Sequence, residues 1–206
     1  GFKNLAPLLF GGGMALVYFV TFAMHFVPFT RVIHSPEPVL LMLAGIVGVW
    51  AVYTVWMNSK RLGFITTLMG HGTVLLSAIY VPEPGILSMA GLLVLSVGSA
   101  WLLARMRWYS VGALGMVLSY GNYVVLLQQS TATPTVEGIL VVLAILTLNH
   151  SIFALGELLS PASLRNGQVK TRGRTTYVSF NTGAYLVVGA VLLGGTTQTA
   201  AYDYLF

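Results

Sequence analysis

Two histidines, His71 and His150, stand inside apolar stretches of the chain, where an imidazole can ligate a metal or carry a proton. His71 lies between two glycines in the segment TTLMGHGTVLLSAIYV, residues 66 to 81. Counting about 1.5 Å per residue along the helices, we expect the two histidines to lie at a similar depth in the membrane. The sequence predicts a polar layer around them in the inner half of the bundle, made of Asn149, Ser151 and Asn181.

This polar layer has three alternative interpretations. Its side chains can hydrogen-bond one another between helices and hold the helices in register, at about 0.6–2 kcal/mol per bond. His71 and His150 can instead be axial ligands of a haem or a (bacterio)chlorophyll, because neutral imidazole coordinates such metals and the glycines beside His71 would let a macrocycle approach. The third interpretation is a path for a proton, an ion, or a small or lipidic substrate, since ionisable residues within membranes often mark such paths.

Catalytic motifs are missing from the sequence. It contains neither H-E-x-x-H nor G-x-S-x-G, and apart from Glu137, the first residue of its span, Glu157 is the only carboxylate inside a predicted membrane span. The absence of cysteine excludes disulfides and thiolate metal sites. We therefore predict no catalytic residue, no separate metal site and no enzymatic activity.

The composition is that of a membrane protein. Of the 206 residues, 56% are hydrophobic and only 7% are charged, whereas soluble domains usually carry about 25% charged residues. Apolar blocks of roughly 20 residues can cross a bilayer, and in lipid they must be helical because every backbone polar group needs a partner. The sequence predicts an all-α fold with seven transmembrane helices, at 5–27, 38–58, 62–82, 86–104, 108–128, 137–158 and 176–197.

The net charge of +5 does not indicate nucleic-acid binding, because the basic residues gather at the ends of the predicted helices. With seven spans, all lysines and arginines except Arg31 fall on one side of the membrane. Lys and Arg are enriched in cytoplasmic loops, so we expect the amino terminus inside and the carboxyl terminus outside, in a bacterial inner membrane. The basic loop at 160–176 is expected to be solvated or, alternatively, to bind anionic lipid headgroups or an acidic partner.

A repeated segment organises the helices. PEPVLLMLAG (36–45) and PEPGILSMAG (82–91) are similar, and TVEGILVVLA (135–144) is a weaker third copy. Each copy opens a predicted helix that is followed by a basic loop and a second helix. The sequence therefore predicts one leading helix followed by three tandem hairpins, within a single transmembrane domain over 1–206 that can be part of a longer protein.

Small residues recur four apart in three predicted helices. Such pairs let helix backbones approach closely and pack. We expect these positions to form packing faces, toward the chain's own helices or toward other membrane subunits, and we favour a structural or accessory role in the membrane. The pairs are Gly11 with Ala15, Ala44 with Gly48, and Ala190 with Gly194.

The segment LLFGGGMALVYFVTFAMHFVP, which begins at Leu8, resembles the bacterial domain-of-unknown-function 2339 family of predicted multi-pass membrane proteins. Looser similarity extends over 105–121 and 177–189. The resemblance implies a helical membrane fold over about residues 5–190 and no known activity, cofactor or catalytic residue. The residues that carry it are Gly11, Gly12, Gly13, Ala15 and Tyr18, together with the polar turn NSKRLG that follows in the next hairpin.

Overall fold

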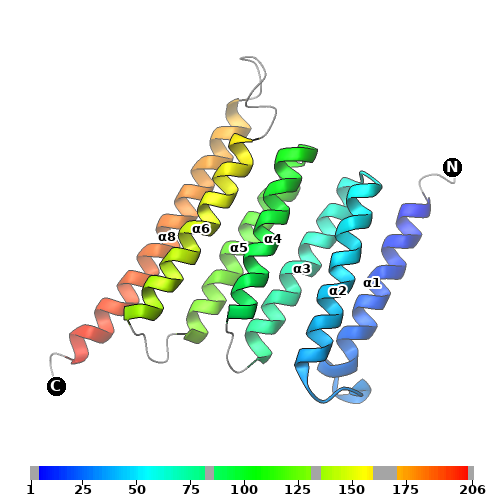
Figure 1. The fold of residues 1–206 in the computed structure, drawn as a ribbon, viewed down its shortest axis with the longest axis horizontal. Coiled ribbons are helices and arrows are strands. Elements are labelled where there is room, and N and C mark those ends of the chain that lie inside the picture. The colour runs from blue at the N-terminus through cyan, green and yellow to red at the C-terminus, as the bar shows by residue number, and fades with distance from the viewer. Residues whose placement is uncertain (1–4, 82–85, 131–135, 160–170, 204–206) are drawn as a thin grey trace. The chain divides into compact units, whose positions relative to one another are not determined.

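The computed structural model describes residues 5–81, 86–130, 136–159 and 171–203, which form helices and no strand (Figure 1). Seven of these helices are long and apolar enough to cross a membrane, so the predicted all-α, multi-pass fold is confirmed at this level. The orientation of the amino terminus stays a prediction. The helices are α1 (Leu5–Phe26), α2 (Pro36–Trp56), α3 (Lys60–Tyr80), α4 (Ile86–Met106), α5 (Tyr109–Ser130), α6 (Val136–Leu158) and α8 (Thr171–Asp203), with a short 3-10 helix η2 (Pro28–Thr30) after α1.

The last helix differs most from its predicted bounds. We expected a polar loop up to residue 176, but α8 already begins at Thr171 and runs for 33 residues. At 1.5 Å per residue this helix is about 50 Å long, whereas the hydrocarbon layer is about 30 Å thick. The part of α8 apolar enough to span is Thr175–Gly194. Hydropathy determines which part of a helix can lie in the membrane, but a helix can continue beyond that part. The polar residues before Thr175 are therefore helical as well.

The described helices fall into two compact units. Unit 1 covers residues Gly1–Glu83 and contains α1, η2, α2 and α3, and unit 2 covers Pro84–Phe206 and contains α4, α5, α6 and α8. The prediction of a single transmembrane domain over 1–206 is not tested by this division and stays a prediction.

In unit 1, polar side chains join α3 to both other long helices. The Tyr18 hydroxyl on α1 lies 3.2 Å from the Met69 carbonyl oxygen and 3.0 Å from Thr73 Oγ1. Thr54 Oγ1 on α2 lies 3.0 Å from Thr66 Oγ1 on α3, and both side chains are buried. Because a threonine hydroxyl can also bond a carbonyl of its own helix, these groups enter the apolar core without losing a partner.

The segment after α1 folds back and caps the end of that helix. Thr30 Oγ1 donates to the Ala23 carbonyl over 2.8 Å, and Arg31 Nε donates to the His25 carbonyl over 2.9 Å. The last carbonyls of a helix have no partner within the helix, so these bonds satisfy groups that would otherwise need water. His25 Nδ1 lies 2.8 Å from the Ile33 carbonyl oxygen and must carry the hydrogen there, because a carbonyl only accepts.

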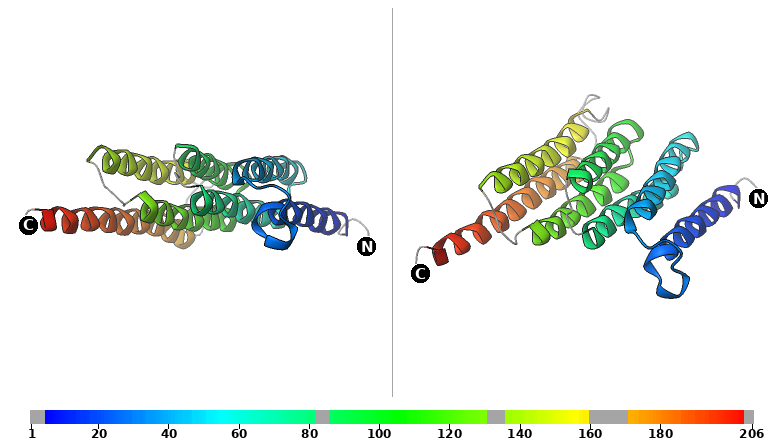
Figure 2. Two further views of the ribbon diagram at one scale, coloured as in Figure 1. Left: turned by 90° about the horizontal axis from the view of Figure 1, so that it is seen from below. Right: turned by 60° about the horizontal axis from the view of Figure 1, so that its bottom comes forward.

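Unit 2 is a four-helix bundle in which α4 and α6 form one layer and α5 and α8 form the other (Figure 2). Two glycines allow close approach between its helices. A Cβ built on Gly156 of α6 would lie 2.8 Å from the Ala100 Cβ of α4, and one built on Gly112 of α5 would lie 2.9 Å from the Leu103 Cβ. Contacts so short exclude any side chain larger than hydrogen unless the helices separate.

We predict that Gly156→Ala lowers the free energy of unfolding by about 1–3 kcal/mol, because the new methyl overlaps Ala100 on the facing helix. Ala100→Gly added to it should restore part of the loss. SDS or thermal unfolding in detergent micelles measures the effect. Gly121→Ala is the matched control, since a Cβ there meets no atom within 4 Å. Equal losses in the two single variants would show that close approach at Gly156 is not the cause.

Candidate functional site

His71 is fully enclosed in the structure. Its side chain on α3 is 1% exposed, and Nδ1 lies 2.9 Å from the Thr67 carbonyl oxygen one turn earlier. Because that carbonyl can only accept, Nδ1 carries the hydrogen at this contact. An imidazole with 1% exposure offers no open ring face to a macrocycle, so haem or chlorophyll ligation at this position would require the helices to separate.

The middle of unit 2 contains a buried cluster of short polar side chains from three helices. Ser96 Oγ on α4 lies 3.0 Å from Ser119 Oγ on α5 and 2.6 Å from Asn149 Oδ1 on α6, and all three residues are 0% exposed. The Ser96 hydroxyl also lies 2.8 Å from the Leu92 carbonyl oxygen of its own helix. One serine therefore holds α4, α5 and α6 at a single point.

A second hydrogen-bonded group connects α8 to α5 and to α6. The Tyr120 hydroxyl on α5 donates to Asn181 Oδ1 on α8 over 2.8 Å. Asn181 Nδ2 donates in turn to the backbone carbonyl of His150 on α6 over 3.1 Å. Asn181 is 2% exposed, so both ends of its amide are bonded inside the core. This chain of bonds links α5, α8 and α6, whereas the first cluster links α4, α5 and α6.

The His150 side chain lies beside these clusters without joining them. Its ring packs against Tyr185 of α8 with the ring centroids 4.7 Å apart, and the Tyr185 hydroxyl lies 3.3 Å from Thr147 Oγ1. His150 Nδ1 is buried and has no hydrogen-bond partner among the described residues. Ser151, predicted in the same layer, donates to the Thr147 carbonyl of its own helix and does not connect helices in the described structure.

One end of the Asn149 amide also lacks a partner. Oδ1 is held by Ser96, whereas Nδ2 is buried with no hydrogen-bond partner in the part of the chain that the structure describes. An unmade hydrogen bond at a buried polar group costs about 1–3 kcal/mol. Trp50 Nε1 in unit 1 and the Tyr177 hydroxyl in unit 2 are in the same situation.

The polar layer is enclosed by apolar side chains along the helices. On α4, Leu92 and Leu103 stand before and after Ser96, and on α6, Leu146 and Phe153 stand before and after Asn149. All four apolar residues are 0% exposed. The arrangement can fasten the helices to one another.

Only some of the predicted site residues come together. Asn149 and Asn181 lie in the core of unit 2, but each bonds different partners. His71 belongs to unit 1 and His150 to unit 2, so the prediction that they share a depth, and with it a joint pigment site, is not tested and stays a prediction.

Sequence reasoning did not identify Ser96, Ser119 and Tyr120. The sequence does contain a signal for the last two. When LMGHG (68–72) in α3 is aligned with VLSYG (117–121) in α5, His71 corresponds to Tyr120. The second helix of each of these hairpins thus carries a polar ring before a glycine. Ser96 had no such signal, since a serine in a membrane helix usually bonds its own backbone.

The predicted packing residues take different positions. Gly11 is buried, and a Cβ there would lie 3.3 Å from the Leu62 side chain of α3. Ala15 is partly buried. The other pairs lie on exposed faces, and a Cβ at either glycine would meet no atom within 4 Å: Ala44 with Gly48 on α2, and Ala190 with Gly194 on α8.

Comparison of the chain with family models, curated proteins and solved structures finds no match. The resemblance to the domain-of-unknown-function 2339 family therefore stays a prediction. Among the described residues there is no group of three or more His, Cys, Asp or Glu side chains that could hold a metal ion.

We predict that Ser96→Ala destabilises the protein by about 1–3 kcal/mol, because it leaves buried polar groups of Asn149 and Ser119 with one partner fewer. The control is Ser151→Ala, whose hydroxyl bonds only its own helix among the described contacts and should change the unfolding free energy by less than about 0.5 kcal/mol. A double-mutant cycle of Ser96→Ala with Asn149→Ala, followed by SDS unfolding, should show a coupling of about 0.6–1.7 kcal/mol. Additive losses would mean that the bond is not a fastener.

Proposed function

We propose that the chain is a structural or accessory subunit of a bacterial inner membrane, with its amino terminus inside, that packs against other membrane proteins. Its seven apolar helices are compatible with a multi-pass membrane protein. The role beyond that is our proposal. We infer no enzymatic activity.

The observation that carries the proposal is the outward position of the small residues on α2. Ala44 and Gly48 are both exposed, and the surface around Gly48 is open. Lipid tails are as apolar as leucine, so helices associate in membranes through close packing of small residues rather than through burial of apolar area. The larger side chains at the borders of this face, Leu41 and Val52, are 66% and 72% exposed and would contact the same partner helix.

The polar groups of the core support a structural role. Ser96, Asn181 and Tyr120 are buried and bond across helices, as expected of fasteners in a bundle. A bundle whose helices are hydrogen-bonded to one another can bind a partner on its outer surface without changing the arrangement of its helices. This is the first of the three interpretations of the polar layer.

We predict that a membrane protein co-purifies with the chain in mild detergent and is lost in Gly48→Leu, because the leucine side chain fills the face where a partner backbone would approach. Mass spectrometry of the purified complex identifies the partner. Gly121→Leu, at another exposed glycine with open space, is the control and should retain it. If both variants keep the partner equally, or the unaltered chain purifies alone from its native membrane, the accessory role is wrong.

A carrier for a small neutral solute is the second candidate. The observation in its favour is the Asn149 amide, whose Nδ2 is buried without a partner among the described residues and can donate to a polar solute. Charged substrates are less suited to this site, because the clusters around Ser96 and Tyr120 consist of neutral groups.

If the carrier interpretation holds, proteoliposomes should take up glycerol or urea faster than empty liposomes, and Asn149→Leu should remove most of that excess rate. Light scattering after rapid mixing measures the uptake. Ser151→Ala should leave the rate unchanged, since its hydroxyl is bonded to its own helix. Uptake equal to that of empty liposomes would exclude both probes as substrates and count against the carrier interpretation.

A further inference from the structure

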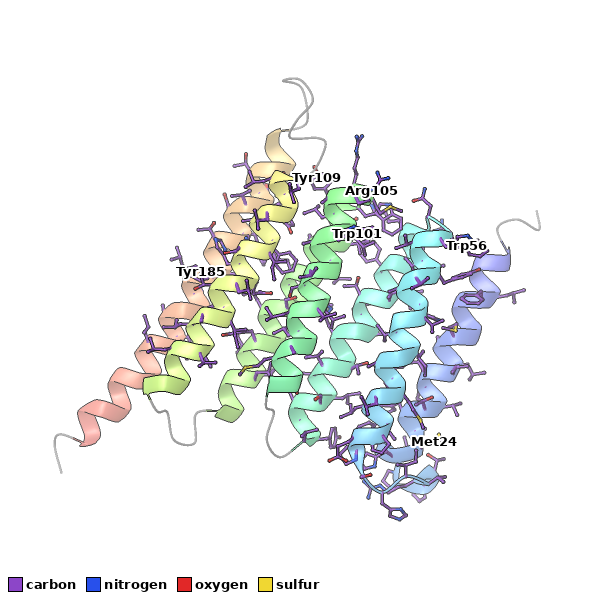
Figure 3. The ribbon with its side chains drawn as sticks, viewed as in Figure 1. Met24, Trp56, Trp101, Arg105, Tyr109 and Tyr185 are labelled. Atoms are coloured by element: carbon purple, nitrogen blue, oxygen red, sulfur yellow. The ribbon has the colours of Figure 1, made fainter. Side chains whose placement is uncertain are left out.

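The end of α4 and the turn that follows it carry two arginines near an exposed tryptophan. Trp101 and Arg105 are four residues apart on α4, and both are exposed. Side chains four apart share one face of a helix, so the indole lies one turn from the guanidinium. Figure 3 shows both at the end of α4, where Tyr109 begins α5. Arg107, also exposed, lies in the turn itself.

These residues lie where the membrane spans of both helices end. The apolar part of α4 is Ser88–Met106, and that of α5 is Tyr109–Leu126. Arg105 and Arg107 therefore stand at the boundary between hydrocarbon and water, where lipid phosphates are found. Trp101 is 45% exposed just inside this boundary, a depth at which tryptophan is enriched in membrane proteins.

No acidic residue in the hairpin neutralises the two arginines. The sequence from Pro84 to Val136 contains neither Asp nor Glu. Glu157 on α6 is the carboxylate of unit 2 whose side chain the structure describes, and it is 2% exposed, whereas both arginines are exposed. The positive charge of this turn is thus available to an anion from outside the chain.

The backbone at Arg107 gives an independent reason to assign a role to its side chain. Its φ angle is 59°, in the left-handed region that glycine adopts freely, asparagine adopts fairly often and most other residues seldom adopt. The turn between α2 and α3 has Asn58 in the same conformation, with φ of 48°, and asparagine tolerates it well. An arginine in this position is less favourable for the backbone than asparagine or glycine would be, which is consistent with a role for its side chain.

We propose that the turn between α4 and α5 binds the phosphate group of an anionic phospholipid. The guanidinium groups of Arg105 and Arg107 face the phosphate, since an arginine can donate two parallel hydrogen bonds to such a group. The Trp101 indole lies against the upper part of the acyl chain. The proposal does not depend on the accessory role, because any membrane protein can carry a lipid site.

The test is lipid binding to the purified full chain in detergent, measured by native mass spectrometry with phosphatidylglycerol and with phosphatidylcholine. We expect the unaltered chain to prefer phosphatidylglycerol, and Arg105→Gln and Arg107→Gln each to weaken that binding about fivefold. Binding of phosphatidylcholine should weaken less, because its choline cation offsets the charge of its phosphate, so the preference for phosphatidylglycerol should shrink. Trp101→Leu should weaken binding of both lipids without removing the preference. Thermal unfolding of each variant establishes that it is folded.

Arg61→Gln is the matched control, because Arg61 is an exposed arginine in the first turn of α3, directly after the corresponding turn of unit 1. It should leave phosphatidylglycerol binding to the unaltered turn within about twofold of its original strength. The proposal would be overturned by no preference for phosphatidylglycerol, by an equal loss in Arg61→Gln, or by full binding in the folded Arg105→Gln/Arg107→Gln double variant. Competition by free glycerol 1-phosphate as effective as that by the lipid would also overturn it, since the site would then recognise phosphate alone.

Discussion

Lipid offers no hydrogen-bond partner, and this constraint determines where the polar groups of the chain stand. The backbone meets it by forming helices. Hydroxyl groups such as those of Thr66 and Thr73 donate to a carbonyl of their own helix and contact a hydroxyl on another helix as well. Asn149 and Asn181 bond residues of other helices instead. Asn149 connects α6 to α4, and Asn181 connects α8 to α5 and α6, so these bonds help to set which helix faces meet in unit 2.

Close approach of the helices is what allows such short side chains to bond. Gly112 and Gly156 bring α5 and α6 so near to α4 that even a methyl group would overlap its neighbour. A serine hydroxyl on α4 then reaches both other helices. Gly48 and Gly194 are used differently. Both are exposed, and a Cβ at either position would meet no atom within 4 Å. Glycine therefore serves both internal packing and the outer surface.

The internal bonds and the outer surface together favour a protein that supports others in the membrane. In the core of unit 2, Ser96, Asn149, Tyr120 and Asn181 are bonded between helices, and buried apolar residues such as Leu92 and Phe153 lie before and after them along the helices. Among the exposed residues are the small residues of α2, together with Arg105 at the end of α4 and Arg107 after it. These are the chemical groups by which helices and lipid headgroups are recognised.

The sequence by itself determined the number and approximate bounds of the helices, because the thickness of the hydrocarbon layer requires apolar blocks of about 20 residues. It also located Asn149 and Asn181 as polar groups within spans. The partners of these groups were decided by tertiary structure. A helix in lipid is apolar on every side, so no hydrophobic period shows which face is buried. For that reason Gly48 and Gly156 look alike in the sequence, although only Gly156 packs against a helix of its own unit, and Ser151 looked equivalent to Asn149 although its described bond stays within its own helix.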